Sequence, residues 1–263
     1  MRGLEDKVIV VVAGGSRSDR PSLGGATSRR LAAEGARVIV ADIDLDAARQ
    51  TVDLIVGDGG VGHAVRCDVA DEHSVEDMFD TAVATFGGID GVHSNAMDMS
   101  AAALGVDGQH DICTLPLDVW QRSLDVGLTG FFLVARYAIP RLIERGGGGI
   151  VGTASGAVFA GEPVRVGYAT AKTGMTAIVR HIASRYGSQG IRANAIAPGL
   201  VLGNERLAAM SPEALAKARK VGRSHRFGTP DDIAGTVAFL LSDDGEWISG
   251  QIINIDGGAI LGR

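Results

Sequence analysis

The chain has 263 residues, of which 46% are apolar, 21% charged and 5% aromatic, and 25 basic against 31 acidic side chains give a formal net charge of −6. This apolar content over this length supports one sizeable core and excludes a disordered linker. Without a run of Lys or Arg, the acidic balance argues against binding to nucleic acid or to an anionic membrane and favours a small-molecule ligand.

The first half of the chain alternates apolar strands with amphipathic helices. A β-branched run predicts the first strand, and a glycine loop at residues 13–15 separates it from the first helix, which Gly35 ends. The predicted strands are Val8–Val12, Arg37–Ala41, Val65–Val69 and Gly91–Ser94, and the predicted helices are Leu23–Glu34, Leu45–Val56 and a helix capped by Ser74 that reaches Phe86.

The second half continues the alternation with longer helices. A long helix is expected to start at Pro116 and to end near Pro140 and the glycine run 146–149. Asp231 and Asp232 favour a helix N-terminus after Thr229. The remaining predicted strands are Ile150–Ala154, Ile191–Ala197 and Gln251–Ile255, and the remaining predicted helices are Tyr168–Tyr186, an insertion at 204–221 and a helix from Thr229 through Leu241.

Strands that are apolar on both faces and alternate with helices predict a parallel sheet covered on both sides. We therefore expect a single α/β domain over residues 1–263, a Rossmann-like doubly wound seven-stranded parallel sheet with helices on both faces. The segments near 98–115 and 204–221 follow strand ends, where ligands bind in such sheets, and are expected to form the substrate wall; a subunit contact is the alternative.

The glycine loop and Asp42 indicate a dinucleotide. A loop between a strand and a helix brings backbone N–H groups to a pyrophosphate. Asp42 ends the second strand, 18 residues after Gly24, where a carboxylate accepts hydrogen bonds from the ribose hydroxyls of NAD and repels the 2′-phosphate of NADP. Arg17 and Arg20 keep NADP as the less favoured alternative. The non-functional interpretation of Asp42 is an exposed polar residue that ends a strand.

Further motifs resemble the short-chain dehydrogenase/reductase family along nearly the whole chain. Tyr168 and Lys172 form a YxxxK motif, which places both side chains on one helix face, and Ser155 lies 13 residues upstream. The family's glycine loop, TGxxxGxG, is represented by Ala13-Gly14 and Ser22-Leu23-Gly24 with seven intervening residues. The other matching segments are ATSRRLAAEGA ending at Ala36, Cys67-Asp68-Val69, Ser94-Asn95-Ala96-Met97, Asn194 to Gly199, and Asp256-Gly257-Gly258.

The resemblance implies an oxidoreductase in which Tyr168 is the general acid/base, Ser155 orients the substrate oxygen and Lys172 holds the nicotinamide ribose. A nearby ammonium favours the phenolate form of a tyrosine. The residues expected to contact the cofactor are Gly14, Arg17, Leu23, Gly24, Asp42, Ile43, Asp68, Val69, Asn95, Ala96, Tyr168, Lys172, Pro198, Gly199 and Val201.

Several positions depart from the family pattern. Ser22 replaces the middle glycine of the loop, and Met97 replaces the glycine after Asn95-Ala96. Glycine stands where the family usually carries a polar side chain at three positions, Gly127, Gly152 and Gly203. These departures indicate a changed pocket.

The expected function is NAD-dependent interconversion of a secondary alcohol and a ketone. An NADPH-dependent 3-oxoacyl thioester reductase and a catalytically weak nucleotide-binding regulatory protein are the alternatives. The resemblance also implies a homotetramer formed through the helices 116–144 and 168–186. Cys67 and Cys113 form no CxxC pair, no signal peptide or apolar stretch of about 20 residues is evident, and no metal-ligand spacing occurs, so we expect a cytoplasmic protein without a metal or membrane anchor.

Overall fold

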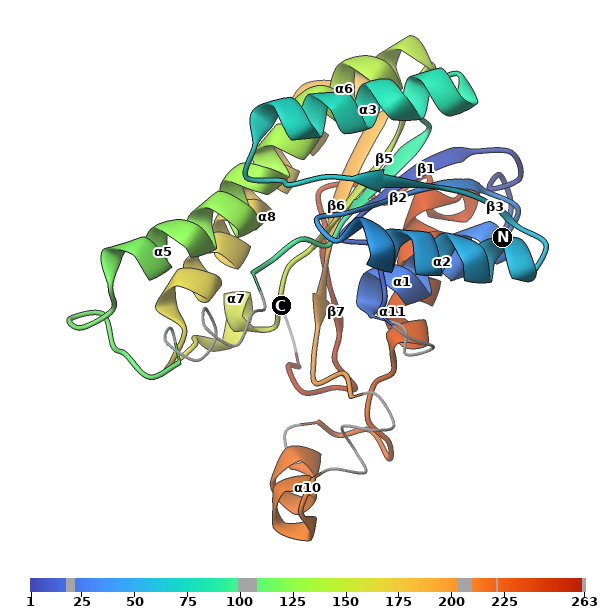
Figure 1. The fold of residues 1–263 in the computed structure, drawn as a ribbon. Helices are drawn as coiled ribbons and strands as arrows, with labels where there is room; N and C mark the ends of the chain where they lie inside the picture. The colour runs from blue at the N-terminus through green and yellow to red at the C-terminus, as the bar shows by residue number, and fades with distance from the viewer. Residues whose placement is uncertain (18–21, 99–107, 203–209, 221, 262–263) are drawn as a thin grey trace.

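The computed structural model describes residues 1–17, 22–98, 108–202, 210–220 and 222–261 (Figure 1). Arg20, Gly203 and parts of the two expected substrate segments lie outside these ranges.

The seven strands form one sheet in the order β3-β2-β1-β4-β5-β6-β7, and every neighbouring pair is parallel. This confirms the predicted doubly wound architecture, because β1 is central and the chain adds strands outward on each side of it in turn. The strands are β1 Val8–Val12, β2 Arg37–Asp42, β3 Val61–Arg66, β4 Gly91–Ser94, β5 Gly148–Thr153, β6 Ile191–Pro198 and β7 Ile252–Ile255.

Helices cover both faces of the sheet (Figure 1). The alternation of side chains along β1 divides the core, since Val10 packs with α3, α6 and α8 whereas Ile9 and Val11 pack with α1 and α11. Helix α10 stands away from these layers, below β7 in the view. The helices are α1 Leu23–Ala33, α2 Leu45–Gly57, α3 Glu72–Phe86, α5 Leu117–Leu124, α6 Gly130–Glu144, α7 Ala157–Ala160, α8 Val166–Tyr186, α10 Pro212–Arg219 and α11 Pro230–Leu241.

The third strand lies earlier than predicted, at Val61–Arg66 instead of Val65–Val69. Strand β3 is at the edge of the sheet and its residues alternate in exposure, so it lacks the continuous apolar run that marks the buried strands. The prediction that Ser74 caps the next helix is also wrong. Asp71 caps α3 by accepting a hydrogen bond from the His73 amide at 3.0 Å, whereas Ser74 Oγ accepts one from the Asp68 amide.

The predicted long helix is divided into α5, a π-helical turn at Asp125–Thr129, and α6. Pro140 lies inside α6 and does not end it; the helix ends at Glu144, before Gly146 adopts a φ of 90°. By length and composition the combined helix Leu117–Glu144 could cross a membrane, which the sequence did not suggest. Its apolar window is 56% buried inside the protein, as in a core helix.

The other boundaries are close to expectation. Helix α8 begins at Val166, two residues before Tyr168, so the predicted catalytic tyrosine lies in its first turn. Thr229 caps α11 as predicted, and a capping box forms because Asp232 Oδ2 accepts a hydrogen bond from the Thr229 amide at 2.8 Å.

Candidate active site

The glycine loop packs tightly against the start of α1. A Cβ at Gly24 would lie 1.9 Å from the Ala13 carbonyl oxygen, so only glycine fits this close approach. Ser22 caps α1: its Oγ accepts a hydrogen bond from the Gly25 amide at 2.9 Å and donates one to the Gly15 carbonyl at 2.8 Å. The serine that replaces the family's glycine therefore holds the loop onto the helix.

The loop leads into the N-terminus of α1, the kind of position where anions bind in other proteins. The first N–H groups of a helix lack intrahelical acceptors and lie at the positive end of its dipole, which makes Leu23 and Gly24 suited to a pyrophosphate. The backbone is also closely packed at Gly14, where a Cβ would lie 2.8 Å from the Val11 carbonyl oxygen.

Asp42 organises the loop from the tip of β2. Its Oδ2 accepts a hydrogen bond from the Gly15 amide at 2.9 Å and its Oδ1 accepts one from the Asp44 amide at 3.1 Å. Arg17 donates a hydrogen bond to Asp44, which lowers the pKa of that carboxyl group. The guanidinium of Arg17 is thus paired with a carboxylate beside the loop.

A cavity of about 240 Å³ lies at the carboxyl ends of β1, β2 and β4. It brings together five residues predicted to contact the cofactor: Asp42, Ile43, Asp68, Val69 and Ala96. Sequence reasoning missed Arg122 in its lining, a residue of α5 whose Nε lies 3.1 Å from Asp98 Oδ2. No local pattern could have joined α5 to this cavity, because the contact is between Arg122 and Asp98, which are 24 residues apart in the chain.

The Cys67 thiol also lines this cavity and is buried. Burial raises the pKa of Cys67 to about 12, so the thiol is protonated at neutral pH.

Lys172 is the buried cation of the site, with 2% of its surface exposed. Its Nζ donates hydrogen bonds to the carbonyl oxygens of Thr153 at 2.8 Å and Ala96 at 3.3 Å. Burial lowers the pKa of Lys172 to about 8. These bonds fix α8 against the ends of β4 and β5, one helical turn from Tyr168 on the same face.

Ser155 follows β5 at this same edge. Its Oγ accepts a hydrogen bond from the Ala157 amide at 3.2 Å, and the next residue, Gly156, donates its amide to the Pro198 carbonyl at 3.4 Å. The segment after β5 therefore adjoins the end of β6.

The remaining predicted contacts lie at strand ends outside the cavity beside Asp42. The Asn95 amide bonds to the Val12 carbonyl at 3.1 Å, which closes β4 onto β1. A Cβ at Gly199 would lie 2.7 Å from Asp256 Cα, and Val201 forms a bridge with Gly228. Pro198 is the last residue of β6 and pairs with Ile255 of β7, and Gly199 adjoins the residue that follows β7.

Gly127 and Met97, two of the departures from the family pattern, are neighbours in the folded chain. A Cβ at Gly127 would lie 2.7 Å from Met97 Sδ and 2.9 Å from Ala171 Cβ. Met97 thus fills space beside the π-helical turn that a side chain at position 127 would need. The two substitutions are coupled through packing, and the methionine makes this wall of the site apolar.

Close packing also explains why glycine stands at position 152. A Cβ at this position would lie 2.9 Å from Met175 Sδ and 3.1 Å from Phe131 Cε2. The glycine therefore admits two large core side chains between the sheet and the helices α6 and α8.

His93 is a buried polar group that sequence reasoning dismissed. Its Nε2 lies 2.8 Å from Thr153 Oγ1, and its Nδ1 has no partner among the described residues. Burial, with the nearby Lys172 charge as the second cause, lowers the pKa of His93 to about 3. The imidazole is therefore neutral at neutral pH.

His93 is expected to make the folded protein less stable as the pH falls. Its ordinary pKa is 6.5, so between pH 6.5 and about 3 the unfolded chain binds one more proton than the folded protein. Its contribution is complete above pH 6.5 and is lost as the pH falls, at up to ~1.4 kcal/mol per unit. His93→Gln should flatten the dependence of unfolding free energy on pH in urea titrations, whereas His73→Gln, at an exposed histidine, should leave it unchanged. Parallel curves for wild type and His93→Gln would refute this assignment.

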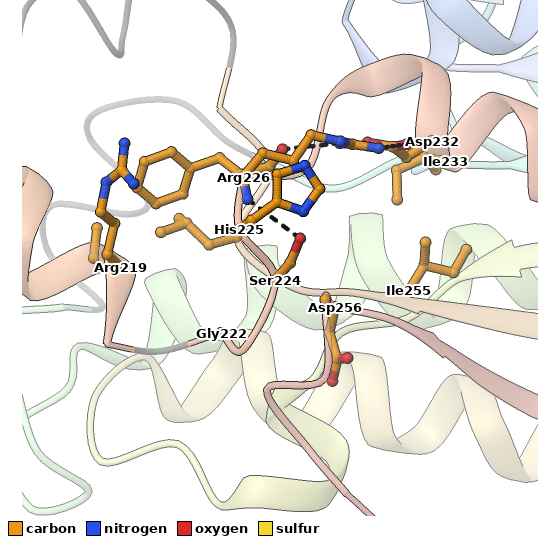
Figure 2. A pocket seen from close by; sticks show the side chains of 14 residues that line it. Arg219, Gly222, Ser224, His225, Arg226, Asp232, Ile233, Ile255 and Asp256 are labelled. Carbon is orange, nitrogen blue, oxygen red and sulfur yellow. Dashed lines mark hydrogen bonds and ion pairs between the residues drawn. The ribbon is translucent and has the colours of Figure 1, made fainter.

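A second cavity, of about 190 Å³, lies between α10, the loop 222–228 and the end of β7 (Figure 2). Arg226 forms two hydrogen bonds with Asp232 there, at 2.6 and 2.7 Å, which hold the pKa of that carboxyl group well below its usual range. Neither Ser155, Tyr168 nor Lys172 lines it. Part of the segment expected to wall the substrate, α10, thus borders a cavity separate from the predicted catalytic residues.

No group of three or more potential metal-ligating side chains occurs in residues 1–17, 22–98, 108–202, 210–220 and 222–261.

The chain is similar over nearly its whole length to known proteins. The profile of a family described as enoyl-(acyl carrier protein) reductase matches residues 18–259. A probable short-chain type dehydrogenase/reductase of Bradyrhizobium diazoefficiens is 38% identical over 99% of this chain and 89% of its own length. Cyclohexanol dehydrogenase of an Acinetobacter strain is 33% identical over 96% of this chain and 94% of its own.

The fold has a similar counterpart among solved structures. A 7α-hydroxysteroid dehydrogenase complexed with NADH and 7-oxo glycochenodeoxycholic acid is 30% identical, with a TM-score of 0.86 over 97% of this chain and 94% of that chain.

Proposed function

Because this chain belongs to the short-chain dehydrogenase/reductase family of oxidoreductases, we propose that it interconverts a secondary alcohol and a ketone with NAD, using Tyr168 as general acid/base. The observation that carries the proposal is the Lys172 ammonium, buried one helical turn from Tyr168 and bonded to the ends of β4 and β5. Cyclohexanol dehydrogenase acts, by its name, on an alcohol of this class.

Tyr168, Ser155 and Lys172 have separate roles in the proposed proton transfer. A bound nicotinamide supplies the hydride acceptor or donor. Tyr168 takes the hydroxyl proton of the alcohol, and Lys172 favours the phenolate because its positive charge lies one turn away. Ser155 orients the substrate oxygen by a hydrogen bond. Two of the three N–H donors of Lys172 bond to carbonyls in the described part of the chain, so one is available for a ribose hydroxyl.

The contacts of Asp42 and Arg17 support NAD over NADP. Asp42 places a carboxylate at the tip of β2, in the lining of the cavity, where it suits ribose hydroxyls and opposes a 2′-phosphate. Arg17, the basic residue of the described part of the loop, is paired with Asp44. The narrow approach at Gly24 gives the cradle for the pyrophosphate.

A cofactor titration tests the proposal. We expect NAD⁺ to raise the Tm at concentrations where NADP⁺ has a smaller effect, since a ligand at 100 times its Kd stabilises a protein by about 2.7 kcal/mol. A panel of secondary alcohols should then produce NADH, followed by its absorbance. Stabilisation by NADP⁺ alone would contradict the role of Asp42, and binding without turnover of any alcohol would favour a regulatory protein.

We also propose a cytoplasmic homotetramer. Free thiols at Cys67 and Cys113 suit a reducing compartment. Leu117 and Phe132, on α5 and α6, are 77% and 47% exposed, which suits a face covered by another subunit. Light scattering that gave the mass of a monomer would contradict the assembly.

A further inference from the structure

Arg165 holds an unusual backbone conformation directly before the helix that carries Tyr168. Its φ is 58° and its ψ is 53°, in the left-handed region. Among the described residues only Asp6, Ala13 and Arg165 adopt a positive φ without being glycine. Such strain persists only where the surroundings impose it, and it often marks a functional site.

The strained backbone places the guanidinium over the tyrosine ring. The Cζ of Arg165 lies 4.8 Å from the centre of the Tyr168 ring, closer than in any other cation–ring pair of the described residues. Glu162 Oε2 accepts a hydrogen bond from Arg165 Nη2 at 2.6 Å and holds the group in place. The side chains of Arg165 and Glu162 are 32% and 13% exposed, so water screens the arrangement only in part.

We propose that Arg165 is a positioning residue for Tyr168, whose guanidinium stabilises the phenolate that forms when the substrate proton is transferred. This inference rests on the proposed acid/base role of Tyr168. A cation over an aromatic face is attracted by the ring quadrupole, and the attraction grows when the ring carries a negative charge. Glu162 opposes this effect electrostatically while it fixes the geometry, so the pair sets an intermediate level of stabilisation.

The other charged groups near the start of α8 either pair with other residues or are the same in the wild type and in the Arg165 and Glu162 variants. Helix α5 and the π-helical turn pack against α8. The Arg122 guanidinium pairs with Asp98, and Asp125 accepts a hydrogen bond from Gln121 at 2.8 Å. Helix α6 and strand β6 also pack against α8, whereas β5 and α7 carry no charged side chain. The remaining charged or titratable side chains on α8 and on the elements packed against it are Lys172, Arg180, His181, Arg185 and Tyr186 of α8, Asp118 of α5, Arg136, Tyr137, Arg141 and Glu144 of α6, and Arg192 of β6. Substitution of Arg165 or Glu162 therefore changes the charge at the ring face and leaves the Lys172 contacts in place.

A spectroscopic titration tests this inference without relying on activity. The phenolate absorbance of Tyr168 is obtained by subtracting the titration of Tyr168→Phe, since the chain holds three tyrosines. For Arg165→Met we expect the midpoint to rise by about 0.5–1 pH unit, and for Arg165→Lys by less, because the charge remains without the planar stacking. Arg185→Met is the matched control: its Cζ lies 5.7 Å from the Tyr186 ring at the other end of α8, and its loss should leave the Tyr168 midpoint unchanged.

The pH profile of alcohol oxidation provides a second readout. The acid limb of kcat/KM should move upward by the same amount in Arg165→Met and downward in Glu162→Gln, where the guanidinium loses its counter-charge. An unchanged Tyr168 midpoint in folded Arg165→Met would overturn the inference, and so would equal shifts of the same sign in Arg165→Met and Glu162→Gln. If Tyr168→Phe retained full activity, the proposed function would fail, while the absorbance titration would still decide whether Arg165 stabilises the phenolate.

Discussion

Tyr168→Phe is expected to lower kcat/KM for alcohol oxidation by about 10²–10⁴-fold, the usual contribution of a general acid or base. The ring stays while the proton-accepting oxygen is lost, so the hydride has no coupled route for the hydroxyl proton. Steady-state rates measured over a range of pH give the effect. Cofactor binding should persist, because Lys172 and the glycine loop are untouched.

The matched control is Tyr186→Phe, at the last residue of the same helix. This variant should keep wild-type rates, since Tyr186 lies five turns of α8 from Tyr168 by the ~3.6 residues of each turn. A Tyr168→Phe enzyme that retained most of the wild-type rate would refute the acid/base assignment and leave the family membership standing.

Gly24→Ala is expected to have the largest effect on stability and on cofactor binding together. The added Cβ would lie 1.9 Å from the Ala13 carbonyl oxygen, 2.8 Å from its carbonyl carbon and 3.0 Å from Gly14 Cα. All three are backbone atoms, so either the loop or α1 must move. Overpacking of this kind costs about 1–3 kcal/mol or more, and displacement of the anion cradle should weaken NAD⁺ binding more than tenfold. Urea unfolding and isothermal titration measure the two effects.

Gly57→Ala provides the contrast, because Gly57 ends α2 and no heavy atom lies within 4 Å of its added Cβ. Alanine is the better helix former by about 1 kcal/mol, so this variant should be as stable as the wild type or more stable. Equal unfolding free energies for the two variants would contradict the argument from close approach at Gly24.

The sequence by itself determined the fold class because the decisive signals are local. Continuous apolar runs such as Val8–Val12 specify strands buried on both faces, and helical segments between them require parallel pairing. The capping of α11 by Thr229 was equally readable, since a cap depends on residues three positions apart. Strand β3 was misplaced because an edge strand needs no buried run, and its position is set by pairing with β2.

The same division applies to the candidate site. The spacing of Tyr168 and Lys172 on one helix, and of Asp42 at a strand tip, follows from helix and strand periodicity alone. Only the tertiary structure decided that Lys172 bonds to Thr153 and Ala96, and that His93 lies beside them. These contacts join the ends of β4 and β5 to α8; His93 and Thr153 are 60 residues apart in the chain, and Ala96 and Lys172 are 76 apart.

The departures from the family pattern show the same limit most clearly. Gly127 and Met97 are 30 positions apart in the sequence, and each reads as an isolated substitution. In the folded chain Met97 occupies the volume that a side chain at position 127 would need, because a Cβ at 127 and the Met97 sulfur would be 2.7 Å apart. Residue type and local spacing determine which chemistry the chain can carry, whereas exclusion between atoms distant in sequence determines the shape in which that chemistry takes place.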